Sequence, residues 1–289
     1  MERPGRQDDA RDRILQGDGA SGVGGAEVAN SPGLARRTRD VGRAFEMKFL
    51  LDEARALEVE AELRRALGAS FAIDPFAEPS RGGYAIRSLY CDTRDFAVLR
   101  RVGSHRFRKY RVRRYGDGTL AYLERKSRRG MAVSKRRVAI DVAELAWLDR
   151  TWLDRTWLRA AEACAPAGWP GASFRAQVER RRLVPACVIG YDRSAFLGVL
   201  EGKPVRVTFD RNVRGRLADG WSLAAGRLER PAFDGVVCEL KFHAGLPVAL
   251  KRIVATFGLV ARGVSKYRHC MRAWGLLPES RAEGEACDA

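Results

Sequence analysis

Apolar and charged side chains alternate residue by residue along several segments of this chain. In Phe45-Glu46-Met47-Lys48-Phe49, three large apolar side chains fall on one face, and a carboxylate and an ammonium fall on the other. Successive side chains of a β-strand point to opposite faces, so this pattern predicts a strand with one apolar and one charged face. The same reading predicts strands over 84–92, 105–115, 119–127, 132–141, 183–193, 203–212 and 235–243.

Only a few segments have the character of helices. Asp52 suits the N-cap of a helix that follows the first strand, and a proline opens a second helix predicted over 247–258. Further helices are expected over 266–275 and over 142–163, where a tryptophan recurs every five residues. Gly116-Asp117-Gly118 is typical of the tight turn of a hairpin. Many antiparallel strands with few helices predict an α+β protein, a closed antiparallel β-barrel with helices packed outside.

Composition divides the chain into three parts. Residues 1–42 contain eight glycines and no aromatic residue, so we expect a disordered N-terminal segment. Residues 279–289 are expected to form a disordered acidic tail, which leaves 43–278 as one folded domain. The sequence has no apolar run of about 18 residues and no apolar signal segment at its start, which favours a cytoplasmic protein.

The chain is strongly basic, with a formal net charge of +17, which points to a polyanionic partner. Its 53 basic residues divide into 45 arginines and only 8 lysines, an arginine bias that genome composition explains. The lysines are therefore the more informative positions. A nucleic-acid-binding protein would fit the charge, but no predicted helix has a concentrated basic stripe and no aromatic single-strand motif stands out, so nucleic acid is disfavoured as a partner.

Three predicted strands share a carboxylate and an ammonium two residues apart: Glu46-x-Lys48, Glu124-x-Lys126 and Glu239-x-Lys241. Ion pairs on a solvated sheet face would give the same spacing, and Glu201-x-Lys203 has it in a turn. A face crowded with cations repels itself unless a polyanion binds there, and carboxylates among them suit a divalent cation that bridges to phosphate. Neighbouring predicted strands add Lys109, Arg111, Arg113, Lys135, Arg137, Arg193 and Arg206. Periodicity leaves open which face of 105–115 points inward, because three other arginines alternate with this set.

Nine short motifs follow one another in a collinear order between about residues 43 and 275. They are Phe45-Glu-Met-Lys48, Arg87-Ser-Leu-Tyr-Cys-Asp-Thr93, Lys109-Tyr-Arg-Val-Arg113, Leu123-Glu-Arg-Lys126, Lys135, Tyr191-Asp-Arg193, Val205-Arg-Val-Thr-Phe-Asp210, Cys238-Glu-Leu-Lys-Phe242 and Val264-Ser-Lys-Tyr267. This order resembles the VTC domain, the catalytic domain of the vacuolar transporter chaperone polyphosphate polymerases. That domain belongs to the triphosphate tunnel metalloenzyme superfamily.

The resemblance implies a closed antiparallel tunnel that binds the triphosphate of ATP and a polyphosphate chain, with Mn²⁺ or Mg²⁺ as the cofactor. The implied catalytic cations are Lys48, Arg111, Arg113, Lys126, Lys241 and Lys266. The implied phosphate-binding residues are Lys135, Arg193, Arg206 and Ser265. Lys109 is added to them because it lies on the same predicted strand as Arg111 and Arg113. Glu239 is implied as the principal metal ligand, with Glu46 and Glu124 as secondary ligands or general base. Some family members have a further lysine where this chain has Gly263.

The function that this resemblance implies is the transfer of the terminal phosphate of ATP to a growing polyphosphate chain. A hydrolase of tripolyphosphate or nucleoside triphosphates stays open, because only the acceptor differs. A non-catalytic polyphosphate-binding protein stays open as well. Eukaryotic relatives have membrane helices, which this sequence does not predict. Any link to a membrane is therefore expected to come through a separate membrane protein, at the inner face of the membrane.

Overall fold

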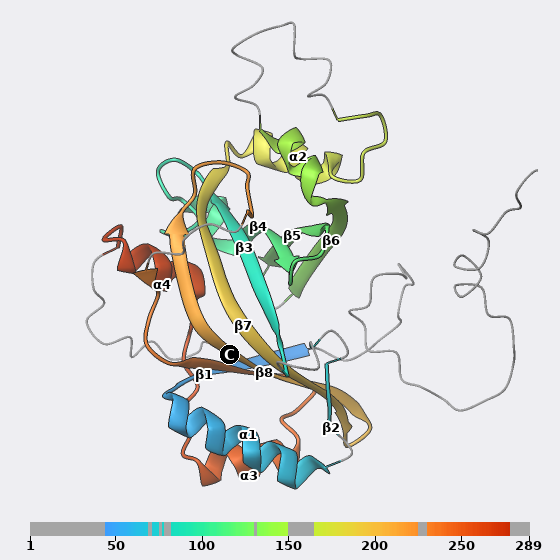
Figure 1. Cartoon of the computed structure of the whole chain (residues 1–289), viewed down its shortest axis with the longest axis vertical. Helices are drawn as coiled ribbons and strands as arrows, with labels where there is room; N and C mark the ends of the chain where they lie inside the picture. The colour runs from blue at the N-terminus through green and yellow to red at the C-terminus, as the bar shows by residue number, and fades with distance from the viewer. Residues whose placement is uncertain are drawn as a thin grey trace, which may run out of the picture. The chain divides into compact units, whose positions relative to one another are not determined.

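The computed structural model describes residues 44–68, 71–74, 77, 82–129, 132–149, 165–224 and 230–277 (Figure 1). The two segments expected to be disordered, 1–42 and 279–289, lie outside the described residues. So does most of the helix expected over 142–163. None of the helices in the described part of the chain is long and apolar enough to cross a membrane.

One antiparallel sheet of ten strands organises the described residues. Its main path runs in the order β1, β10, β8, β7, β3, β4, β5, β6. These strands are β1 (Ala44–Leu51), β3 (Tyr84–Asp92), β4 (Arg108–Tyr115), β5 (Leu120–Arg129), β6 (Ala132–Asp141), β7 (Val184–Leu200), β8 (Lys203–Leu217) and β10 (Val236–His243). The short strands β2 (Phe71–Ile73) and β9 (Arg230–Pro231) pair with β7 and β8. With a few helices, this sheet confirms the α+β class.

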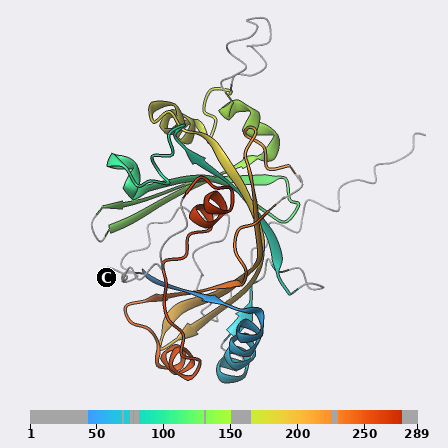
Figure 2. The ribbon, with the colours of Figure 1, turned by 90° about the vertical axis from the view of Figure 1, so that its left-hand side faces the viewer.

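The hydrogen-bonded path ends at β1 on one side and at β6 on the other. These two strands do not pair within the described residues, so the predicted closure of the barrel is not confirmed. The sheet nevertheless curls, because the twist between neighbouring strands accumulates over so many of them. Side chains of β1 and β5 thereby come together, with Lys126 Nζ 3.8 Å from the Glu46 carboxylate. Figure 2 shows the green strands β4 to β6 facing the blue strand β1 across the concave side.

Two helices cover the convex face at the β1 end of the sheet. They are α1 (Glu53–Leu67) and α3 (Val248–Thr256). Alternation turns Phe49 and Phe209 to this face, where they form a buried cluster with Leu63 and Leu250. As predicted, Asp52 caps α1, where its carboxylate accepts a hydrogen bond from the Arg55 backbone N–H at 2.7 Å.

A second apolar cluster covers the convex face of β3 to β6. It is closed by α2 (Ala172–Arg180) and by a 3₁₀ helix, η3 (Val142–Leu148), which forms the first part of the helix expected over 142–163. The helix α2 was not predicted, because only Phe174 and Val178 on it are buried and the rest of its sequence is polar. Residues 103–107 form a second 3₁₀ helix, η2, so β4 begins three residues later than predicted.

The helix α4 (Lys266–Ala273) corrects the expectation that every helix packs outside. Its residues Tyr267, Cys270 and Met271 are buried against Cys187 and Ile189, on the same sheet face as the charged residues described below. This arrangement is possible because β7 is apolar on both faces and must be covered on both. Gly215 allows the close approach, since a Cβ there would collide with the Cys270 sulfur. Figure 2 shows α4 between the two facing parts of the sheet.

Candidate functional site

The charged faces of β1 and β10 form a cluster on the concave side, which we call the β1–β10 cluster: Glu46, Lys48, Glu239 and Lys241. The register pairs Glu46 with Lys241 and Lys48 with Glu239, so opposite charges face each other. Lys48 Nζ lies 2.6 Å from Glu46 and 3.6 Å from Glu239, and Lys241 Nζ lies 2.8 Å from Glu239. The two carboxylates therefore share one ammonium between them.

Both carboxylates of the β1–β10 cluster are ionised at neutral pH. Burial and the nearby Glu239 raise the pKa of Glu46, but Lys48 and Lys241 outweigh them and lower it. Burial also raises the pKa of Glu239, yet Lys241 and Lys48 hold it well below the usual range. Burial lowers the pKa of Lys48, but the two glutamates raise it further than burial lowers it. The four side chains of the cluster therefore stay charged at neutral pH. A bound cation could replace a lysine beside the carboxylates, and a bound anion could replace a carboxylate beside the lysines.

A second group of charges, the β4–β6 cluster, consists of Arg111, Glu124, Lys135 and Arg137. Arg111 Nε donates to Glu124 at 2.5 Å, and Lys135 Nζ and Arg137 Nε lie 3.4 and 3.6 Å from the same carboxylate. Burial raises the pKa of Glu124, but Arg111, Arg113 and Lys135 together lower it well below the usual range. One buried carboxylate therefore holds three cations in place.

The register of β4 answers the question that periodicity left open. Lys109 lies opposite Lys126, and Arg111 lies opposite Glu124, so the set Lys109, Arg111 and Arg113 is on the concave side. Arg113 is buried and donates to the Ser88 hydroxyl at 3.1 Å. The alternate set faces away, as Arg114 illustrates by donating to backbone carbonyls of the turn after β4.

A buried ion triad joins β7, β8 and α4. Arg193 donates to both carboxylate oxygens of Asp210 at 2.6 and 2.7 Å, and Lys266 Nζ lies 2.6 Å from the same group. Asp210 has no solvent exposure. Burial raises its pKa, but Arg193 and Lys266 bring it down to about 2. Ser265 caps α4, since its hydroxyl accepts from the Arg268 backbone N–H at 3.5 Å.

Arg206 lies on the same sheet face beside Lys241, but it is held by other partners. Its guanidinium is 2.9 Å from both the Asp74 carboxylate and the Tyr84 hydroxyl. Burial raises the pKa of Tyr84 to about 12, so its hydroxyl stays protonated. Arg206, Asp74 and Tyr84 thus form a hydrogen-bonded group next to the β1–β10 cluster.

The site residues of β1, β5 and β10 lie on the charged faces that the alternation predicts, the register decides the face of β4, and the grouping of the carboxylates differs from the expected one. Glu46 and Glu239 are neighbours, whereas Glu124 belongs to the separate β4–β6 cluster. Asp210 and Asp74 have no role in the predicted site, and Arg137 was expected among the cations of the charged strands but not among the implied catalytic or phosphate-binding residues. The signal for Asp210 was available, because it shares the parity of Arg206 along β8. Asp74 follows a three-residue strand with no periodicity of its own.

The carboxylates of the concave face could bind a divalent cation together with waters and phosphates. Among the described residues there is no group of three or more His, Cys, Asp or Glu side chains that could hold a metal ion alone. Mg²⁺ does not need such a cage, because it commonly binds through one or two carboxylates together with waters and substrate phosphates. The adjacent, ionised Glu46 and Glu239 fit this coordination. Glu124 fits it less well, because Arg111 already occupies one of its oxygens and the cations Lys135 and Arg137 lie 3.4 and 3.6 Å from the other, which accepts no hydrogen bond from the described residues.

Lys109 gives the concave face a pH dependence that can be measured. Its side chain is accessible to solvent, but desolvation by the surrounding concave face, together with the nearby Lys48 and Lys126, lowers its pKa to about 8. An anion favours the protonated lysine, so tripolyphosphate affinity should fall about threefold or more between about pH 7 and pH 9.5. Calorimetric titration at several pH values measures this. Lys109→Arg keeps its charge and should flatten the profile; an unchanged profile in that variant would contradict the assignment.

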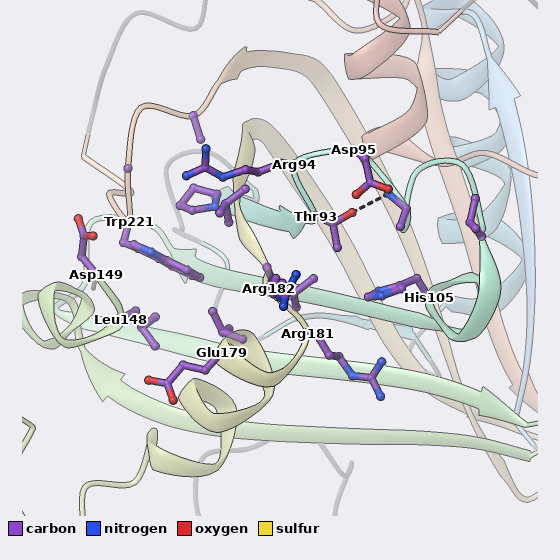
Figure 3. Close-up of a pocket in the computed structure, with 18 of the residues that line it drawn as sticks. Thr93, Arg94, Asp95, His105, Leu148, Asp149, Glu179, Arg181, Arg182 and Trp221 are labelled. Atoms are coloured by element: carbon purple, nitrogen blue, oxygen red, sulfur yellow. Dashed lines mark hydrogen bonds between the residues drawn. The ribbon is translucent and has the colours of Figure 1, made fainter. Parts of the chain in front are cut away.

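A large cavity lies away from these charges. It has a volume of about 1040 Å³ and lies at the end of β3, beside the C-terminal end of α2. Figure 3 shows its lining, which includes both the basic Arg94, Arg181 and Arg182 and the acidic Asp95, Asp149 and Glu179. None of the predicted site residues lines it. Its mixed charges do not favour an anion over a cation.

The family model described as the VTC domain matches residues 43–275. Comparison with curated proteins gives no match.

Solved structures with a similar course of the chain include a protein from Hippeastrum, named as a candidate adenylyl cyclase with a dominant triphosphatase activity. It is 17% identical, with 81% of this chain and 97% of that chain covered and a TM-score of 0.41. A candidate adenylate cyclase from Vibrio parahaemolyticus is 13% identical, with coverages of 80% and 99% and a TM-score of 0.39. A protein from Pyrococcus horikoshii is 13% identical, with coverages of 79% and 98% and a TM-score of 0.41.

Proposed function

Because this chain belongs to the VTC domain family, we propose that it is an enzyme that transfers the terminal phosphate of ATP to a growing polyphosphate chain. The observation that supports this function is the excess of positive charge on the concave face. In the part of the chain that the structure describes, cationic side chains on this face outnumber the carboxylates, which are Glu46, Asp74, Asp92, Glu124, Asp210 and Glu239. The cations are Lys48, Lys109, Arg111, Arg113, Lys126, Lys135, Arg137, Arg193, Arg206, Lys241 and Lys266. Such an excess is stable in one concavity when a polyanion neutralises it.

The chemistry of phosphoryl transfer suits this inventory of side chains. The transfer needs little covalent help from the protein and depends on alignment and charge neutralisation. Lys48, Arg111 and Arg113 would bind the triphosphate. The carboxylates of Glu124 and Asp210 would hold their cationic neighbours in position before the substrate binds. Lys126, Lys241 and Lys266 would contact the phosphates during transfer, with Lys109, Lys135, Arg193, Arg206 and Ser265 extending the binding surface.

Glu239 and Glu46 would hold the divalent cation, with Mn²⁺ or Mg²⁺ as the expected ion. When bound, the ion would neutralise part of the negative charge of the phosphate groups. Glu124 remains a weaker candidate ligand. The contact between Glu46 and Lys126 supports a closed tunnel in which side chains complete the wall between β1 and β6.

Incubation of the purified protein with ATP and Mn²⁺, followed by a gel stained for polyphosphate, tests this function. A ladder of long chains that disappears with a chelator is the expected result. Release of free phosphate without a ladder would replace the polymerase with a hydrolase of the same fold. Binding of long polyphosphate without any turnover of ATP would indicate a non-catalytic binding protein.

We also propose a separate membrane protein as partner, with the enzyme at the inner face of the membrane. Its test is a pulldown from membranes.

A further inference from the structure

A second, smaller cavity lies on the convex face of the sheet, where α2 packs beside β5 and β6. Its volume is about 380 Å³. It is lined by Leu123, Arg125, Lys135, Arg136, Arg137, Val138, Pro170, Ser173, Phe174 and Gln177. Four of these residues are cationic and none is acidic. This composition differs from the larger cavity of Figure 3, where the charges are mixed.

Two arginines give this cavity its charge on the convex face. Arg125 of β5 and Arg136 of β6 lie directly opposite each other in the register. They share a face with Leu123 and Val138, which belong to the apolar cluster beneath α2. Like charges directly opposite on two strands destabilise a sheet. Neither guanidinium forms an ion pair or hydrogen bond with another residue in the described part of the chain, so an external anion would relieve this repulsion.

The helix α2 adds neutral hydrogen-bond donors to the same cavity. Ser173 lies in its first turn, with a hydroxyl that can donate to an oxyanion. The Gln177 side-chain oxygen accepts from Arg180 at 2.8 Å, which leaves the Gln177 amide N–H groups free to donate. Phe174 forms an apolar floor and packs edge-on against Tyr110. Glu179, the acidic residue of α2, lines the other cavity instead.

The edge strand β6 connects this cavity with the concave face. Lys135 and Arg137 turn to Glu124 on the concave side, while Arg136 between them turns to the convex side. Three consecutive residues thus carry positive charge around one strand. The far edge of β6 pairs with no strand among the described residues. A flexible polyanion bound among the concave charges can therefore continue over this edge without crossing an acidic side chain.

We propose that Arg125, Arg136, Ser173 and Gln177 form a second phosphate-binding site, which holds the distal part of a polyphosphate chain whose other end lies on the concave face. The inference rests on the proposed function, because that function supplies the chain. Because Arg125 and Arg136 turn to the opposite face of the sheet from Lys135 and Arg137, a long chain can reach both sites more readily than tripolyphosphate can, so the second site is expected to discriminate by length. It favours long chains over short ones.

The test compares the affinity of long-chain polyphosphate with that of tripolyphosphate in the full-length protein, by titration at fixed ionic strength. The double variant Arg125→Gln/Arg136→Gln should weaken long-chain binding about three- to tenfold, the size expected for two exposed charge-assisted contacts. The loss should be clearly smaller for tripolyphosphate. Gln177→Glu, which adds a carboxylate to the cavity, should shift the preference in the same direction. Thermal unfolding verifies that both variants are folded.

The matched control is Lys251→Gln/Arg252→Gln, which removes the same charge from exposed positions on α3. It should leave the ratio of the two affinities unchanged. Equal long-chain affinity in the parent and in Arg125→Gln/Arg136→Gln would overturn the second site. So would equal losses for both ligands, because these would reflect net charge alone. A loss of binding to vesicles that contain phosphoinositides, with long-chain binding intact, would assign the arginines to a lipid headgroup instead. Failure of tripolyphosphate to bind the parent protein would instead refute the proposed function.

Discussion

Glu239→Gln is expected to lower the turnover of ATP by about a thousandfold or more, the loss expected when a principal group for charge stabilisation is removed. Glu239 is almost fully buried between Lys48 and Lys241. Burial raises its pKa, but Lys241 and Lys48 outweigh burial and hold the pKa well below the usual range. Glutamine keeps the size of the side chain but loses the negative charge that a divalent cation needs. The measurement is the rate of phosphate transfer at saturating Mn²⁺.

A second readout separates a metal ligand from a structural ion pair. Without metal, Glu239→Gln should bind tripolyphosphate as tightly as the parent or more tightly, because it removes a negative charge from a cationic face. A merely structural role would weaken binding in both conditions. Glu201→Gln is the matched control, since Glu201 has the same spacing to a lysine but lies in a turn, where it accepts from the Val248 backbone N–H. Retention of more than about a tenth of the parent turnover in Glu239→Gln would contradict its assignment as principal ligand.

Asp210→Asn is expected to destabilise the protein by about 3–5 kcal/mol, since breaking a buried pair leaves uncompensated charge. Asp210 has no exposure, and both Arg193 and Lys266 depend on it. Asparagine cannot neutralise two cations. The helix α4 should therefore loosen from the concave face, and the melting temperature in thermal unfolding should fall. Protection of the α4 amides in hydrogen exchange should fall with it.

The pH dependence of stability gives the same prediction a direct check. Burial raises the pKa of Asp210, but Arg193 and Lys266 lower it to about 2, below the ordinary value of 3.8. Its contribution is therefore fully present above about pH 4 and is lost as pH falls through about 2. The parent should lose stability over this window more steeply than Asp210→Asn. Parallel curves for the two proteins would mean that the carboxylate is not paired in solution. Glu58→Gln on the exposed face of α1 is the control for a carboxylate with little effect.

Much of the fold follows from the alternation in the sequence. The strands around Glu46, Glu124 and Glu239 were predicted with their charged faces assigned correctly, because the side-chain period of a strand is a local property. The helix at Asp52 was predicted for a similar reason, since an N-cap is a contact within three residues. The helix α2 was not predicted because its two buried residues, Phe174 and Val178, are buried by contacts with strands that are distant in the sequence.

What the sequence determined by itself is which residues of this protein share a face, including most of the cations proposed to bind phosphate. Only the tertiary structure decided which faces meet. It separated Glu124 from Glu46 and Glu239, gave Asp210 its two cations and brought α4 onto the concave side. The reason is physical: strand alternation is set by neighbouring residues, whereas curvature accumulates over many strands and depends on contacts between distant segments.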